Sequence, residues 1–206
     1  MRRVLCALMA LSTFACGVGE GEGWVRSDNL YIDDCWNGEF DLGPDFFAAN
    51  PSPGSKSVTF RVQHGDNIEE VSDGLIVVVN QLPTVPGQIG QNVEVGMPPG
   101  VSPPGVPVVY DQDPPKVSLA LSLHGSCHAQ NGTVYSISGS INFESLYSGD
   151  PNEDEADELL TEARFDALFA DPRNLVGTDV PANAQSQVRG YFRFFYQRGQ
   201  PAQPFQ

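Results

Sequence analysis

The chain has 206 residues, enough for one domain with a real hydrophobic core, and carries a net charge of −15 from 26 acidic and 11 basic residues. This acidity, with no basic cluster in the sequence, argues against nucleic-acid binding and against adsorption of the folded domain to anionic lipid. The 21 glycines and 17 prolines favour turns and short strands over long helices.

The first fifteen residues are organised like a secretory signal. Arg2 and Arg3 supply a positive start, and residues 4–14 form an apolar run. This run is too short to cross a bilayer as a stable helix, so we expect residues 1–15 to be a cleaved signal peptide. Residues 16–23 are rich in glycine and glutamate after the initial cysteine, and are predicted to be a flexible tether.

Residues 11–16 (Leu-Ser-Thr-Phe-Ala-Cys) resemble a bacterial lipobox, where signal peptidase II cuts just before a cysteine that has received a diacylglycerol group. Ala15 matches the small residue before that cysteine, whereas Thr13 stands where leucine is usual. The resemblance implies that Cys16 is lipidated, with palmitate-type acyl chains that hold the mature protein in the membrane. Gly17, which follows, is not an aspartate retention signal, and this favours the outer membrane.

Cysteine parity supports an oxidising compartment. The chain has four cysteines, of which Cys6 leaves with the signal. If Cys16 is lipidated, Cys35 and Cys127 remain as one disulfide pair, worth about 4–5 kcal/mol in the chain-entropy account. The alternative is a plain secreted protein, cut after Ala15, whose Cys16 is free or paired between chains.

The first half of the domain reads as short strands separated by turns. We expect the first strand within residues 24–36, with Leu30 and Ile32 on one face, and a turn at Asn37-Gly38. Further strands are predicted around residues 40–42, 58–62 and 75–79, the last buried on both faces because it is continuously apolar. Residues 82–116 hold nine of the chain's prolines and are predicted to be an ordered Pro/Gly-rich excursion with short strands at 93–95 and 106–110.

Residues 117–143 read as the central hairpin. Leucines alternate with polar residues over 117–123, and Cys127 shares their parity, so it is expected to point inward. Asn131-Gly132 supplies the turn. The second strand is expected to place Tyr135, Ile141 and Phe143, among other odd-numbered residues, on its buried face.

Two interpretations compete after the acidic run at residues 148–158. Good helix formers allow a helix over 153–170, whereas alternation of Ala163, Phe165, Ala167 and Phe169 with polar residues favours a strand at 163–169, the interpretation we prefer. The last strand is predicted at 188–197. This pattern predicts an all-β, antiparallel β-sandwich, Ig-like or jelly-roll-like, as a single domain over residues 24–199 with a tail at 200–206.

Few residues suggest chemistry. His124, Cys127 and His128 have metal-ligand character, but the histidines fall on the face opposite to Cys127. Asp150, Asn152 and Asp154 have the spacing of the first calcium-loop ligands, a motif that then fails at Glu155 and Thr161. We therefore predict no metal, no cofactor and a solvated acidic run.

No catalytic motif is recognisable, and His64, followed by Gly65-Asp66, has no marked nucleophile. The better binding candidates are Tyr191, Arg193 and Phe195, which share the outer face of the last strand. Trp24, Tyr31 and Trp36 gather near the start of the domain. A covering second sheet or the excursion would instead make these aromatics structural.

The chain resembles cell-envelope lipoproteins of myxobacteria and related bacteria. The resemblance rests on the Cys16 lipobox and on three short motifs: Ser72-Asp73-Gly74, Phe143-Glu-Ser-Leu-Tyr147 and Gly190-Tyr-Phe-Arg-Phe194. These motifs imply a location and no reaction. We therefore expect a non-enzymatic, lipid-anchored protein of the outer membrane, with a structural or adaptor role towards an envelope protein or glycan. The alternative is a carbohydrate- or ligand-binding module; a hydrolase ranks third.

Overall fold

The computed structural model describes residues 21–52, 56–65, 72–102, 113–127, 132–150, 152, 158–175 and 180–196. Ten strands and three short 3₁₀ helices make up its regular structure. The strands are β1 (Gly21–Ile32), β2 (Trp36–Leu42), β3 (Phe46–Pro51), β4 (Val58–Gln63), β5 (Asp73–Val79), β6 (Asn92–Gly96), β7 (Val117–Leu123), β8 (Thr133–Ser145), β9 (Leu160–Ala170) and β10 (Gln185–Phe195). The 3₁₀ helices are η1 (Pro86–Gln88), η2 (Pro172–Asn174) and η3 (Ala182–Ala184). Within these residues, no helix is long and apolar enough to span a membrane.

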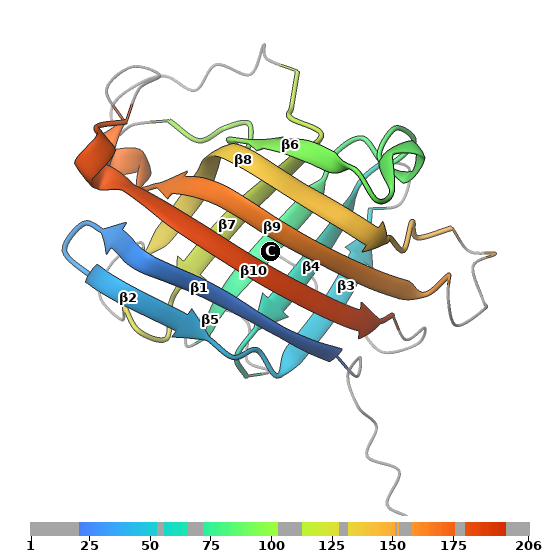
Figure 1. Cartoon of the computed structure of the whole chain (residues 1–206), viewed down its shortest axis with the longest axis horizontal. Coiled ribbons are helices and arrows are strands. Elements are labelled where there is room, and N and C mark those ends of the chain that lie inside the picture. Colours follow the sequence, from blue (N-terminus) through green and yellow to red (C-terminus); the bar gives the residue numbers. More distant parts are fainter. Residues whose placement is uncertain are drawn as a thin grey trace, which may run out of the picture.

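All ten strands belong to one sheet in the order β2-β1-β10-β9-β8-β6-β7-β5-β4-β3. Every pair is antiparallel except β6 with β7. The sheet curls into a half-barrel, so that β1, β10 and β9 pass in front of β3, β4 and β5 in Figure 1. The all-β class is therefore confirmed. Two separate sheets are not shown, because hydrogen bonds join all ten strands into one.

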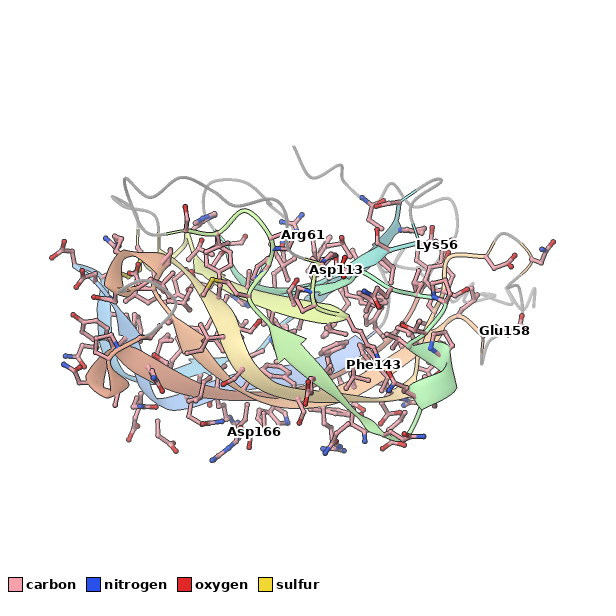
Figure 2. The ribbon with its side chains drawn as sticks, turned by 90° about the horizontal axis from the view of Figure 1, so that it is seen from above. Lys56, Arg61, Asp113, Phe143, Glu158 and Asp166 are labelled. Carbon is pink, nitrogen blue, oxygen red and sulfur yellow. A yellow bond between two sulfur atoms is a disulfide. The ribbon has the colours of Figure 1, made fainter. Side chains whose placement is uncertain are left out.

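The curl buries the concave face of the sheet against itself. Phe47 of β3 stacks on Phe194 of β10 with ring centroids 5.8 Å apart, and Phe60 of β4 meets Phe194 edge-on at 6.0 Å. Phe143 points into this interior in Figure 2 and is fully buried. The core is therefore formed between strands that lie far apart in the sheet order.

Large and small inner residues alternate across three adjacent strands. Phe143, Ala163 and Phe192 are register partners on β8, β9 and β10, and all three are fully buried. One step along, Phe165 lies between Ile141 and Gly190. A Cβ on Gly190 would collide with the Phe165 ring, so glycine is needed for this close approach.

Most sequence-predicted strands are confirmed. Strand β9 settles the competition over residues 153–170 in favour of the strand, because Ala163, Phe165, Ala167 and Phe169 are all buried on one face while the polar residues between them are more exposed. The predicted strand at 93–95 is β6. Residues 103–112, which include the predicted strand at 106–110, lie outside the described residues, as do the predicted signal peptide, Cys16 and the predicted C-terminal tail.

Two local predictions are wrong near the start of the domain, and one strand was missed. Strand β1 includes residues 21–23, which were predicted to belong to the tether. A Cβ at Gly21 would lie 2.7 Å from atoms of Phe47 and Phe194, so only glycine fits at this contact. The turn after β1 comprises residues 33–35, with Asp34 at φ 59°, and Asn37-Gly38 belongs to β2. Strand β3 was not predicted at all, because Phe46 and Phe47 are consecutive and give no alternation.

A β-bulge between Ser136 and Ser138 corrects the predicted parity of β8. The extra residue turns the faces over, so Val134 and Ser136 are buried before the bulge, and Ile141 and Phe143 after it. Tyr135 consequently lies on the outer face. Strand β5 is also less buried than predicted, because Ile76 and Val78 are partly exposed.

The Ser136 side chain lies where strands β6, β7 and β8 diverge. Strand β8 pairs with β7 through Thr133–Tyr135 but with β6 through 140–142, so β6 enters as a wedge between β7 and β8. At this junction the Ser136 hydroxyl accepts a hydrogen bond from Leu119 N (2.9 Å) and donates one to Gly96 O (2.8 Å). A fully buried side chain thus satisfies backbone groups that the diverging strands leave unpaired.

We expect Ser136→Ala to lower the free energy of unfolding by about 1–3 kcal/mol, because it leaves the buried Leu119 N–H and the Gly96 carbonyl without their hydrogen-bond partner. Chemical denaturation measures the change. The matched control is Ser138→Ala, the same substitution two residues away at an exposed position, which should stay within about 0.5 kcal/mol of wild type. Equal effects of the two substitutions would remove the special role of the Ser136 hydroxyl.

Candidate functional site

The convex side of β1, β10, β9, β8 and β6 carries an ordered array of charged, aromatic and amide side chains. We call this surface the arginine face, because four of the six arginines in the described residues lie on it. Asp166 marks it in Figure 2, where its side chain points away from the interior. The face comprises Glu22, Trp24, Arg26, Asp41, Asn92, Glu94, Ser140, Asn142, Glu162, Arg164, Asp166, Arg189, Tyr191 and Arg193.

Two rows of ion pairs run across this face. In the first row, Arg26 Nε lies 3.1 Å from Asp41 Oδ2, and Arg189 Nε lies 3.2 Å from Asp166 Oδ2. These four side chains are more than half exposed, so each pair contributes at most about 1 kcal/mol. Their effect is to neutralise the charge of this surface locally.

In the other row of ion pairs, Arg193 Nε lies 3.5 Å from Glu162 Oε2. Glu162 is the less exposed partner and also accepts a hydrogen bond from the Tyr191 hydroxyl at 3.2 Å. The Arg193 guanidinium lies over the Phe195 ring at 5.6 Å. This row therefore joins charges and aromatic rings on two neighbouring strands.

Between these two rows lies a central row of planar groups. Register places Trp24 of β1 beside Tyr191 of β10, then Arg164 of β9, Asn142 of β8 and Asn92 of β6. The Arg164 guanidinium carbon lies 4.3 Å above the Tyr191 ring. Asn142 Nδ2 donates to Asn92 Oδ1 at 3.4 Å. The central row thus offers two aromatic rings, a guanidinium and two amides in one line.

The environment of Tyr191 favours its neutral phenol. Partial burial, the charge of Glu162 and the hydrogen bond to Glu162 all raise the pKa of Tyr191, and Arg164 only partly opposes them. The native state therefore holds the phenolic proton more tightly than the unfolded chain does. This contribution to stability is complete below the ordinary tyrosine pKa and is lost as the pH rises through the raised value.

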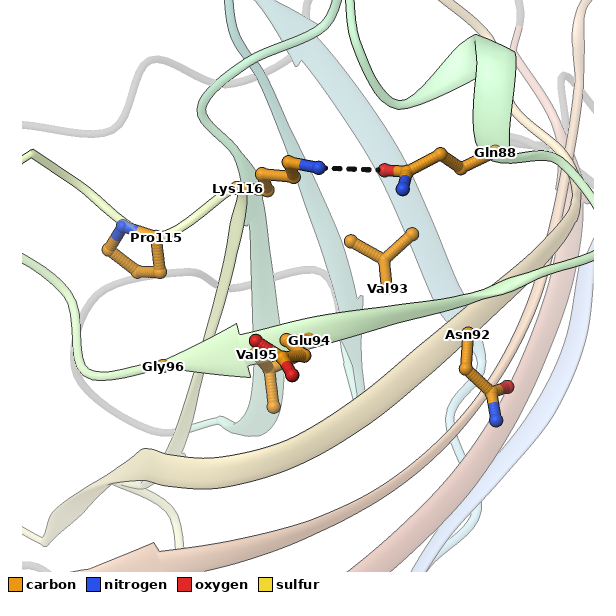
Figure 3. Close-up of a pocket in the computed structure, with 8 residues that line it drawn as sticks. All are labelled: Gln88, Asn92, Val93, Glu94, Val95, Gly96, Pro115 and Lys116. Carbon is orange, nitrogen blue, oxygen red and sulfur yellow. Dashed lines mark hydrogen bonds between the residues drawn. The ribbon is translucent and has the colours of Figure 1, made fainter.

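A cleft of about 520 Å³ opens beside β6, at the end of the central row (Figure 3). Its lining includes Asn92 and Glu94 of β6 and, across from them, Gln88 and Lys116. Lys116 Nζ donates to Gln88 Oε1 at 3.2 Å, as the dashed line shows. The volume falls within the range of about 300–1,000 Å³ typical of small-molecule sites. Asn92 belongs to both the cleft and the central row.

The predicted cysteine pair is brought together by the curl of the sheet. Cys35 lies in the β1–β2 turn and Cys127 follows β7, yet their Cα atoms are 5.7 Å apart, a normal disulfide separation. Buried Asp171 steadies the same turn by accepting from Asp33 N at 3.1 Å. Its hydrogen bond with Arg173 raises the pKa of that guanidinium and fixes both side chains.

The candidate metal ligands are not assembled into a site within the residues described. Asp150 Oδ1 accepts from Asn152 N and Nδ2, both at 2.8 Å, which is a local turn, and Asp154 lies outside the described part. His128 also lies outside it, and His124 is half-buried. Among the described residues, no group of three or more histidine, cysteine, aspartate or glutamate side chains is placed to hold a metal ion. His64 is an exposed partner of Asp45 at 3.4 Å.

All three predicted ligand-binding residues lie on the outer side of β10, as predicted. Tyr191 occupies the central row, Arg193 lies in the row beside it, and Phe195 lies at the end of the strand, where its ring contacts the Arg193 guanidinium. Sequence reasoning missed Arg164 and Asn142, which lie on other strands. In the sequence, both residues alternate with buried neighbours, which predicts that they face outward. Only the pairing of the strands shows that they lie beside Tyr191.

Trp24 does not gather with Trp36. It pairs in register with Tyr191, whereas Trp36 packs edge-on against Phe40 at 5.6 Å near the β1–β2 turn.

Comparison with known protein families, with curated proteins and with solved structures finds no match to this chain. The arginine face and the cleft are therefore interpreted from their own chemistry.

We expect Glu162→Gln to lower the pKa of Tyr191 towards its ordinary value of 10.0, because it removes the negative charge beside the phenol. Carbon NMR of tyrosine-labelled protein resolves the titration, and Tyr191→Phe assigns the signal. Glu94→Gln, at the far end of the face, is the control and should leave the Tyr191 titration unchanged. An unshifted Tyr191 in the Glu162 variant would contradict this electrostatic account.

We expect replacement of both Cys35 and Cys127 by serine to lower the free energy of unfolding by about 2–5 kcal/mol, since the pair spans 92 residues of sequence. Denaturation with and without a reducing agent measures this. The reductant should destabilise the wild type to the level of the double variant and leave the variant itself unaffected. A wild type insensitive to reductant, with two titratable thiols, would show that the bond does not form.

Proposed function

We propose that this chain is a lipid-anchored protein of the bacterial cell envelope that has no catalytic activity and presents the arginine face to a binding partner. The lipid is attached at Cys16, the protein belongs to the outer membrane, and the role is structural or adaptor-like. The domain acts outside the cytoplasm, where disulfides persist.

The observation that carries this proposal is the proximity of Cys35 and Cys127. Their Cα separation of 5.7 Å assigns two of the four cysteines to one pair. Cys6 lies in the predicted signal, so the lipobox-like Cys16 is the one cysteine left for modification. Parity, an apolar leader of signal length and the lipobox thus support the same conclusion.

The surface supports a binding role. The arginine face has a half-exposed aromatic pair, paired charges and an adjoining cleft, which are the usual ingredients of a recognition surface. We also propose that the domain behaves mechanically as a two-layered β-sandwich body, with the residues between 82 and 116 as an excursion on it. The contacts of Phe47 and Phe60 with Phe194 across the curl support the two layers.

A second candidate function, carbohydrate binding, is favoured by one specific observation. Trp24 and Tyr191 are direct register neighbours in a row that continues through a guanidinium and two amides. Aromatic rings that flank hydrogen-bonding planes suit the apolar faces and hydroxyl groups of sugars. This candidate is compatible with the lipid anchor.

Mass spectrometry of the protein purified from membranes should find an N-terminal Cys16 carrying acyl chains. Cys16→Ser should leave an unprocessed or unanchored protein that no longer partitions into detergent, because each buried methylene contributes about 0.8 kcal/mol of membrane affinity. Cys6→Ser is the matched control, since that residue lies within the predicted signal, and it should leave processing and anchoring intact. A mature protein that begins at residue 16 with an unmodified thiol would refute the anchor.

A further inference from the structure

The central row and the cleft form one continuous path across the molecule. Five strands contribute one side chain each, so the row spans four strand spacings, or about 19 Å. It begins at Trp24, passes Tyr191, Arg164 and Asn142, and reaches Asn92, which lines the cleft in Figure 3. A path of this length fits an extended, linear ligand that crosses the strands.

Arg164 and the neighbouring Asn142 Oδ1 are the groups of this path that have unused hydrogen-bonding capacity among the described residues. The other three arginines of the face pair with Asp41, Asp166 and Glu162. Arg164 makes neither an ion pair nor a hydrogen bond among the described residues and is held by its stacking on Tyr191 alone. Its planar fork of N–H donors is therefore fixed in orientation and open to a ligand.

The net charge of the chain and the charges on the arginine face indicate which class of ligand the central row binds. A net charge of −15 repels polyanions at long range, whereas the face itself, with four arginines and five carboxylates, is close to neutral and suits an uncharged ligand. The buried centre of a protein–protein interface is more apolar than the surrounding surface, whereas this row contains no aliphatic side chain and three of its five groups are a guanidinium and two amides. An uncharged chain rich in hydroxyl groups remains, since hydroxyls both accept from Arg164 and donate to amide oxygens.

We propose that the central row binds a linear neutral glycan, with one end of the chain in the cleft beside β6. Sugar rings pack along Trp24 and along the Arg164–Tyr191 stack, in which a guanidinium covers one face of the phenol ring. Arg164 binds neighbouring hydroxyls, and the terminal unit meets the amide and ammonium groups of Gln88 and Lys116. This proposal deepens the binding role proposed above and rests on it only for the display of this face outside the cell.

The test uses the full processed protein in a sugar-free detergent. The Trp36→Phe background leaves Trp24 as the single tryptophan of the chain, so its fluorescence reports on the row. The probes are linear neutral oligosaccharides of glucose, mannose, xylose and N-acetylglucosamine, with polygalacturonate as the anionic arm. We expect saturable binding of at least one neutral probe with a Kd below about 1 mM.

Variants then locate the binding. Arg164→Ala and Trp24→Leu should each weaken the affinity for that probe about tenfold, with calorimetry replacing fluorescence for the second. Arg189→Ala is the matched control on the same face, because it lies in a row of ion pairs, and it should change the affinity less than about twofold. Arg164→Gln, which keeps hydrogen bonding without charge, should retain part of the affinity; thermal melts check that every variant is folded.

Four results would overturn the glycan proposal: no binding of any neutral probe, binding of polygalacturonate alone, equal loss in the Arg189 control, or capture of a protein partner that Arg164→Ala abolishes while the sugars are inert. None of these affects the lipid at Cys16, which mass spectrometry decides separately. Failure of the anchor would likewise leave glycan binding by the folded domain to be measured.

Discussion

The contact of Phe47 with Phe194 is the constraint on which the rest of this structure depends. A single sheet can bury its concave face only if strands from its two halves meet, and this pair joins β3 to β10 with rings 5.8 Å apart. Aromatic pairs contribute about 0.5–1.5 kcal/mol beyond the area that they bury. Gly21 makes the approach possible, since a Cβ there would lie 2.7 Å both from the Phe47 ring and from Phe194 Cβ. Because the curl turns one face inward, the other face of β1, β9 and β10 is available for recognition.

The inner packing also determines the outer pattern. Phe143, Ala163 and Phe192 fit together because a small residue lies between two rings, and the same rule places Phe165 over Gly190. A slip of two residues between these strands would bring ring against ring inside, and a slip of one would exchange the two faces of the strand. The register that the core requires is thus the register that places Arg164 beside Tyr191 outside. The arrangement of the arginine face is a consequence of core complementarity, and its own ion pairs are too exposed to specify it.

The parts of the fold that could be predicted from sequence are those with a clean period of two. Strands β4, β7, β9 and β10 follow from alternation, and the Cys35–Cys127 pair follows from parity once Cys16 is assigned elsewhere. Prediction failed where a backbone irregularity or a distant contact decides the local structure. The bulge after Ser136 reverses the faces of β8, and β3 is a strand because its phenylalanines meet partners from other parts of the sheet. The candidate site was found in part, since Tyr191 and Arg193 share a strand, whereas Arg164 joins them only through pairing.

The position of the proposed anchor bears on what the face can reach. Eight peptide units separate Cys16 from Trp24, so the start of the central row lies within about 29 Å of a lipid at Cys16, even for a fully extended chain. The cleft lies at the opposite end of the row, about 19 Å further across the sheet if the row extends away from the membrane. A linear polymer bound along this path would therefore be held close to the bilayer. With the proposed anchor, that geometry would suit a protein that links a membrane to the polymer layer next to it.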